Sequence, residues 1–154
     1  MRLLVRKLML VVQKLKTKWL ARSLASVGQE FIISKGVRLI NAENISIGNN
    51  VFLGEGAYLN ATHGHIVIGN NVAIGPFTRI YSWNHKVGAG GWPEDRDGFE
   101  APGVVIGNDV LVGGSVLLLA GTKITNGVVV GAGAILRGKV YSGLAVIPSS
   151  AVST

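Results

Sequence analysis

Residues 106–140, "IGNDVLVGGSVLLLAGTKITNGVVVGAGAILRGKV", decide the fold of this chain. A large aliphatic residue recurs at every sixth position without a slip: Ile106, Val112, Leu118, Ile124, Val130 and Leu136. A second set follows each of these by four positions and is small or β-branched: Val110, Val116, Thr122, Val128, Ala134 and Val140. A period of six fits neither an α-helix nor an alternating hairpin strand, so neither element is expected here.

A period of six describes a short strand, a corner and another short strand, with one large aliphatic residue pointing inward in each unit. Glycine and asparagine gather directly after the inward residue, as "IGNNV" at 47–51 and 68–72, "IGNDV" at 106–110 and "ITNGV" at 124–128. Both residue types tolerate the positive φ that a tight corner demands. Stacked corners of one kind predict a parallel β-helix in which three units make a triangular coil of about eighteen residues. Because one coil cannot bury its inner face alone, stacking is the expected source of stability.

The same spacing extends toward the N-terminus. It runs through Ile47, Leu53 and Leu59, and again through Ile68, Ile74 and Ile80. The stretches between Val37 and Ile45 and around "NATHGHIV" at 60–67 fit only with short insertions. We therefore predict one β-helix domain over residues 28–143, followed by a C-terminal tail over 144–154.

The charge of the chain is concentrated in one segment. The formal net charge is +7, and residues 1–29 hold seven basic residues and no acid, so the remainder is neutral. A body without net charge argues against a general nucleic-acid binder. The chain has no cysteine, which excludes disulfides, thiolate metal sites and a cysteine nucleophile and is compatible with a cytoplasmic location.

Residues 1–27 are predicted to form a basic amphipathic helix. Apolar residues recur at helical spacing, namely Leu4, Leu8, Val11, Val12, Leu15 and Trp19, with basic residues on the other side. The longest apolar run, "LMLVV" at 8–12, is too short to span a bilayer. Two interpretations stay open: the helix caps the end of the β-helix, or it rests peripherally on an anionic membrane surface.

The segment "YSWNHKVGAGGWPEDRDGFEAPG" at 81–103 interrupts the repeat. It predicts a loop extruded over 83–103, and insertions on one face of a solenoid often carry the binding surface. His85 lies at the root of this loop, with Trp83 and Trp92 as apolar walls on either side. An imidazole can take a proton from a hydroxyl group, and acyl transfer from a thioester needs little more than such a base and N–H groups that stabilise the oxyanion.

The stretches "IGNNVAIGPFTRIYSWNH" at 68–85 and "APGVVIGNDVLVGG" at 101–114 resemble the hexapeptide-repeat acyltransferases, and among them the maltose, galactoside and polysaccharide O-acetyltransferases. The resemblance covers roughly residues 31–140. It implies a left-handed β-helix, a homotrimer with active sites between subunits, acetyl-coenzyme A as acyl donor, no metal, and His85 as the general base.

The resemblance also suggests which residues border the two substrates. The expected acceptor-side residues are His63, Glu55, Asn84 and Trp92, and the expected donor-side residues are Gly114, Ala132, Arg137 and Lys139. Arg137 and Lys139 would pair with the coenzyme A phosphates. The chain departs from the family pattern at Leu111, where many relatives have tryptophan, and in the tail "AVIPSSAVST", which lacks a glycine–proline–lysine arrangement.

The function that we predict is acetylation of a sugar hydroxyl, on a surface-polysaccharide or glycolipid precursor. An alternative with the same machinery is N-acetylation of an amino-sugar nucleotide. Two further alternatives are a metalloenzyme like the γ-type carbonic anhydrases, which need three converging histidines, and a non-catalytic β-helix that has lost its site. His63 and His65 are the only histidines close together in the sequence, and no second histidine follows His85 nearby. The spacing therefore does not match the metalloenzyme pattern.

Overall fold

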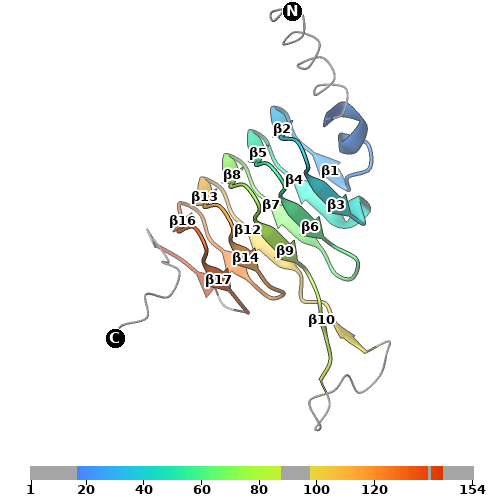
Figure 1. The fold of residues 1–154 in the computed structure, drawn as a ribbon, viewed down its shortest axis with the longest axis vertical. Helices are drawn as coiled ribbons and strands as arrows, with labels where there is room; N and C mark the ends of the chain where they lie inside the picture. Colours follow the sequence, from blue (N-terminus) through green and yellow to red (C-terminus); the bar gives the residue numbers. More distant parts are fainter. Residues whose placement is uncertain (1–16, 88–97, 139, 144–154) are drawn as a thin grey trace, which may run out of the picture.

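The computed structural model describes residues 17–87, 98–138 and 140–143. Residues 17–21 are helical, and the chain then winds into a stack of short strands (Figure 1). Apart from one short antiparallel pair, the strands form three parallel sheets, and each sheet takes at most one strand from a coil. The predicted all-β solenoid, a parallel β-helix, is thereby confirmed.

Each sheet runs the length of the stack. The first contains β1 (Ser26–Val27), β4 (Ile45–Ile47), β7 (Ile66–Ile68), β12 (Val104–Ile106), β15 (Lys123–Ile124) and β18 (Val140–Tyr141). The second contains β2 (Phe31–Ile33), β5 (Val51–Leu53), β8 (Val72–Ile74), β13 (Val110–Val112) and β16 (Val129–Val130). The third contains β3 (Arg38–Ile40), β6 (Tyr58–Asn60), β9 (Arg79–Tyr81), β14 (Leu117–Leu118) and β17 (Ile135–Leu136).

The strand register shows where the coils depart from eighteen residues. Ile106 pairs with Ile124, eighteen positions on, whereas Ile47 pairs with Ile68, 21 positions on. The extra residues lie in the segment around His63, one of the two predicted insertions. The other insertion holds the short 3₁₀ helix η1 (Ala42–Asn44). Between Ile68 and Ile106 the separation is 38, because the extruded loop adds twenty residues to one coil.

The core is the column of aliphatic side chains inside the coils. Among the residues at six-residue spacing, Ile106, Leu118 and Val130 are at most 1% exposed, as predicted. Thr122 is the polar member of the second set, and its buried hydroxyl donates hydrogen bonds to the carbonyls of Leu119 and Leu136 at 2.6 and 3.2 Å. The inner positions therefore hold one continuous core, with the polar exception satisfied.

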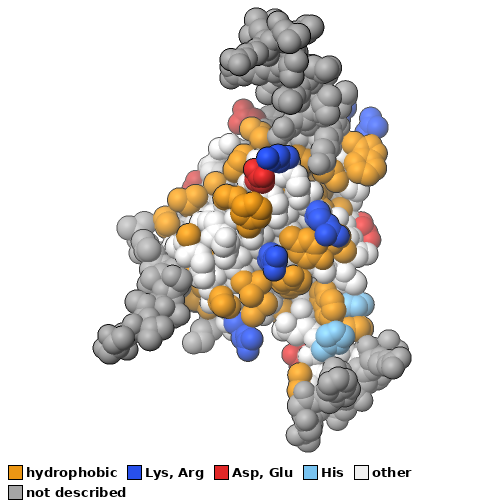
Figure 2. Space-filling model, viewed as in Figure 1, with side chains coloured by type: hydrophobic (Ala, Val, Ile, Leu, Met, Phe, Trp, Pro, Cys, Tyr) orange, Lys and Arg blue, Asp and Glu red, His pale blue; other side chains and the backbone are white. Residues whose placement is uncertain are grey.

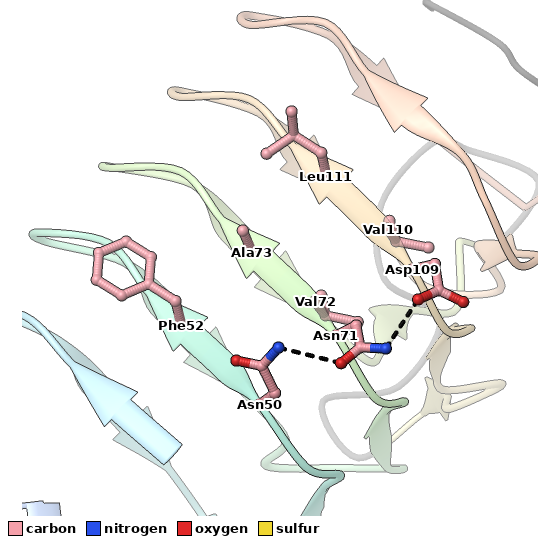
Figure 3. A pocket seen from close by; sticks show the side chains of 8 residues that line it. All are labelled: Asn50, Phe52, Asn71, Val72, Ala73, Asp109, Val110 and Leu111. Atoms are coloured by element: carbon pink, nitrogen blue, oxygen red, sulfur yellow. Dashed lines mark hydrogen bonds between the residues drawn. The ribbon is translucent and has the colours of Figure 1, made fainter. Parts of the chain in front are cut away.

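The corners use asparagine in two ways. Side-chain oxygens of Asn49, Asn70, Asn108 and Asn126 each accept a backbone N–H from the preceding coil at 2.8 Å. In the next column, Asn50, Asn71 and Asp109 have φ between 52° and 56° and are joined by side-chain hydrogen bonds (Figure 3). These ladders explain why the "GNN" and "GND" motifs recur at this corner.

The second sheet presents an apolar stripe to the outside. Phe52, Ala73 and Leu111 stand in a row on neighbouring strands, beside the Asn50–Asn71–Asp109 ladder (Figure 3). Phe52 is 41% and Leu111 50% exposed. Leu111 thus lies on the outer surface. Having leucine here, where many relatives have tryptophan, changes the exposed surface of the second sheet and leaves the core unchanged.

The boundary between the N-terminal helix and the β-helix lies earlier than predicted. The helical residues end at 21, and Ser26 and Val27 form β1, which pairs with β4. The Ala25 N–H donates to the carbonyls of Ala42 and Ile45, which draws the chain into the first sheet before residue 28. Residues 1–16 of the predicted helix and the tail 144–154 lie outside the described residues. Within the part that is described, no helix is long and apolar enough to cross a membrane.

Candidate active site

The loop leaves the β-helix after β9 and returns just before β12 (Figure 1). Hydrogen bonds join its two ends at the root, which we call the neck. β10 (Asn84–His85) pairs antiparallel with β11 (Phe99–Glu100), with His85 opposite Phe99. The buried Ser82 accepts the Gly103 N–H at its carbonyl at 3.0 Å and donates its hydroxyl hydrogen to the carbonyl of His63. Ser82 thereby ties both ends of the loop to the insertion that carries His63.

Four aromatic rings meet at this neck. His63 stacks on Phe99 with ring centroids 4.0 Å apart, and His85 lies against Phe99 at 5.0 Å. Trp83 meets both imidazoles edge-on, each at 5.1 Å. Two of the three histidines, 22 positions apart in the sequence, therefore share the same two aromatic neighbours, and packing restricts the orientation of His85 while its side chain stays exposed.

Asn60 fixes the indole and the insertion relative to each other. Its Oδ1 accepts the Trp83 Nε1–H at 3.3 Å, and the Thr62 hydroxyl and backbone N–H at 2.7 and 3.0 Å. Its Nδ2 donates to the Tyr58 hydroxyl oxygen at 3.2 Å. A single amide at the end of β6 therefore connects the third sheet, the His63 insertion and the loop.

The loop root and one residue of a late coil border an open pocket of about 470 Å³. It is lined by Asn84, His85, Lys86, Val87, Glu100 and Arg137. Arg137 follows β17 and comes from a coil much later in the sequence. The predicted base His85, the predicted acceptor residue Asn84 and the predicted donor residue Arg137 thus line one hollow.

The remaining predicted residues lie in other places. Gly114 and Ala132 occupy stacked corners of successive coils, where the carbonyl of Gly114 accepts the Gly133 N–H at 2.9 Å. Glu55 lies at the corner before β6, pairs with Lys35 at 3.1 Å, and is not among the residues that line the His85 pocket. Trp92 and Lys139 lie outside the described residues.

The sequence did not single out Phe99 or Asn60. Phe99 is the aromatic residue at which the loop turns back toward the repeat, and its position just ahead of "EAPG" was the available signal. Asn60 follows an inward leucine at the point where the six-residue spacing breaks. Over the described ranges 17–87, 98–138 and 140–143, no group of three His, Cys, Asp or Glu side chains is arranged to hold a metal ion.

No family model matches this sequence. Its structure resembles a maltose O-acetyltransferase from Clostridium difficile 630, with 30% identity over 79% of this chain and 64% of that one and a TM-score of 0.69. A galactoside acetyltransferase solved with coenzyme A is 25% identical over 80% of this chain and 63% of that one, with a TM-score of 0.67. A hexapeptide-repeat acetyltransferase from Vibrio cholerae O1 biovar eltor, solved with acetyl-coenzyme A, is 22% identical over 77% and 63%, with a TM-score of 0.68.

These neighbours are hexapeptide-repeat acetyltransferases, which confirms the resemblance that the sequence motifs indicated. The chain spans 63% to 64% of the length of these three proteins.

Proposed function

We propose that this chain, which has the fold of the hexapeptide-repeat acetyltransferases, transfers an acetyl group from acetyl-coenzyme A to a sugar hydroxyl. His85 acts as the general base: its imidazole accepts the hydroxyl proton while the hydroxyl oxygen attacks the thioester carbonyl carbon. The carbon–sulfur bond then breaks, and the coenzyme A thiolate leaves with the proton that the imidazolium returns. The chemistry needs no covalent enzyme intermediate, in keeping with a chain that has no cysteine.

The observation that carries the proposal is the neck of the loop. His85 is exposed to the pocket on one side and held by Trp83 and Phe99 on the other. A solvent-exposed loop side chain with no catalytic role would not need two aromatic neighbours and a strand pair to fix its orientation. Proton transfer requires an oriented base, since general-base efficiency depends on geometry before it depends on pKa.

The donor side is assigned to the last coils. Arg137 lines the same pocket as His85, and its guanidinium offers the forked donors that match phosphate oxygens. Gly114 and Ala132, at stacked corners, have no bulky side chain to obstruct an extended pantetheine arm. Coenzyme A would therefore lie along these coils with its thioester toward His85, and Lys139 would assist Arg137.

The acceptor side is assigned to His63, Asn84 and Trp92, and the acceptor to a surface-polysaccharide or glycolipid precursor. We further propose a homotrimer with the site completed by a neighbouring subunit. The basic segment at the N-terminus would hold the enzyme peripherally at the anionic cytoplasmic face of a membrane, where such a precursor is presented.

Thiol release from acetyl-coenzyme A tests the proposal most simply. The full chain is incubated with a panel of sugars, sugar phosphates and amino sugars, and the products are identified by mass spectrometry. Acetyl esters on hydroxyl-bearing acceptors are the expected products. Acetyl amides formed only from amino sugars would replace the proposed acceptor by an amino-sugar nucleotide, and no thiol release with any acceptor would contradict acyl transfer to a sugar.

A further inference from the structure

The outer side of the third sheet carries basic and aromatic side chains that have no role in the proposed acetyl transfer. In register along β3, β6 and β9 stand Arg38, Tyr58 and Arg79, and beside them Asn60 pairs with Tyr81. Figure 2 shows Lys and Arg side chains among hydrophobic ones over these strands, with His side chains below them at the root of the loop. Basic and aromatic side chains therefore alternate across neighbouring coils.

These side chains form a pocket and do not project independently. The Arg38 guanidinium lies over the Tyr58 ring, 5.4 Å from its centroid, and the Tyr58 and Tyr81 rings are 5.7 Å apart with a 49° tilt. Together with Arg79 and Gly56 they line a hollow of about 340 Å³. Two half-buried tyrosine rings form its floor, and two exposed arginines stand at its edge.

The arginines are not used for ion pairing within the described parts of the chain. Within the described residues the Glu55 carboxylate pairs with Lys35, and no carboxylate comes within 4.0 Å of Arg38 or Arg79. Arg38 makes its contact with a tyrosine ring, which leaves the donors of its guanidinium available. The pocket is thus a local concentration of positive charge next to aromatic surface.

A chain of hydrogen bonds joins the pocket to the candidate active site. The Tyr58 hydroxyl oxygen accepts the Asn60 Nδ2–H, and Asn60 Oδ1 accepts the Trp83 Nε1–H. Trp83 in turn contacts both His63 and His85. A ligand held by the tyrosines and arginines would therefore lie on the same surface as the histidines, one asparagine away from their aromatic neighbour.

We propose that this pocket binds the anionic group, phosphate or carboxylate, of a charged sugar. Guanidinium groups match the paired oxygens of either anion, and tyrosine rings provide surface for the apolar face of a sugar. The identification of this sugar as the acetyl acceptor rests on the proposed acyl transfer, whereas the binding site itself does not. An uncharged sugar would leave both arginines unused and would bind more weakly.

Binding is tested by calorimetry on the full chain without acetyl-coenzyme A, with glucose 1-phosphate, glucuronate, inorganic phosphate and glucose as probes. Arg79→Gln removes the charge, Arg79→Lys keeps it without the fork, and Arg22→Gln is a matched control at an exposed arginine near the end of the N-terminal helix. We expect the charged sugars to bind more tightly than glucose. Arg79→Gln should weaken them by about tenfold, since hydrogen bonds to charged groups are the strong ones, and binding should fall as salt rises.

The comparison of probes identifies the anion, because tighter binding of glucose 1-phosphate or of glucuronate distinguishes a phosphate from a carboxylate ligand. Equal affinity for glucose and for both charged sugars would overturn the proposal, as would affinities in Arg79→Gln that match those of Arg22→Gln. This binding assay contains no acetyl-coenzyme A, so its result does not depend on turnover. If the chain proves not to transfer acetyl groups, the binding result therefore remains valid. If the charged sugars do not bind, acetyl transfer to uncharged sugars remains possible.

Discussion

Replacing Leu118 by alanine should destabilise the protein far more than replacing Leu111, although both leucines lie in strands of the same coil. Leu118 is fully buried and is stacked between Ile80 and Leu136 of the adjacent coils. Leucine-to-alanine changes in a core cost about 2–5 kcal/mol, and a site packed above and below belongs near the middle of that range, about 3 kcal/mol. Leu111 is 50% exposed, so its truncation should cost about 1 kcal/mol or less.

Urea denaturation at one protein concentration measures both variants against the wild type. The midpoint should fall clearly for Leu118→Ala and only slightly for Leu111→Ala, with similar slopes. Equal destabilisation by the two variants would refute the assignment of six-residue positions to the inside of the coil.

Three further predictions concern the donor, the assembly and the N-terminal segment. Arg137→Gln should raise KM for acetyl-coenzyme A by about three- to tenfold with a smaller change in kcat, and Arg22→Gln should leave both unchanged; a fall in kcat alone would remove Arg137 from the donor site. Light scattering at micromolar concentration should give the mass of a trimer, and a monomer would remove the proposed inter-subunit site. The full chain should bind anionic but not neutral vesicles and be released by salt; equal binding to both kinds, or none to anionic vesicles, would leave the capping interpretation.

The coil architecture could be predicted because its rule is local. One large aliphatic residue in six and a corner rich in glycine and asparagine are visible in the sequence without knowledge of any long-range contact. Breaks in the six-residue spacing are equally visible in the sequence, so the insertion around His63 and the loop beyond His85 were both predicted. The end of the N-terminal helix was placed too late, because Ser26 and Val27 join the sheet through pairing with β4, which no helical periodicity reveals.

The surroundings of His85 could be predicted only in part. The sequence indicated His85 as the candidate base, with Trp83 beside it, but the stack of His63 on Phe99 joins residues 36 positions apart across an irregular loop. The arginine–tyrosine pocket depends on coil length in the same way. A strict count of eighteen from Arg38 leads to Gly56, whereas the first coil contains twenty residues and places Arg38 beside Tyr58.

The central claim, that His85 removes a proton from the acceptor, is tested most directly by turnover of His85→Ala with acetyl-coenzyme A and an acceptor found in the sugar panel. His65→Ala serves as the matched control, because His65 is an exposed histidine one coil earlier that makes no ring contact with the four aromatic residues of the described neck. His85→Ala should keep the wild-type assembly and coenzyme A affinity while turnover falls by at least about 100-fold, the contribution typical of a general base. More than half of wild-type turnover in His85→Ala would contradict the mechanism and make His63 the next candidate base.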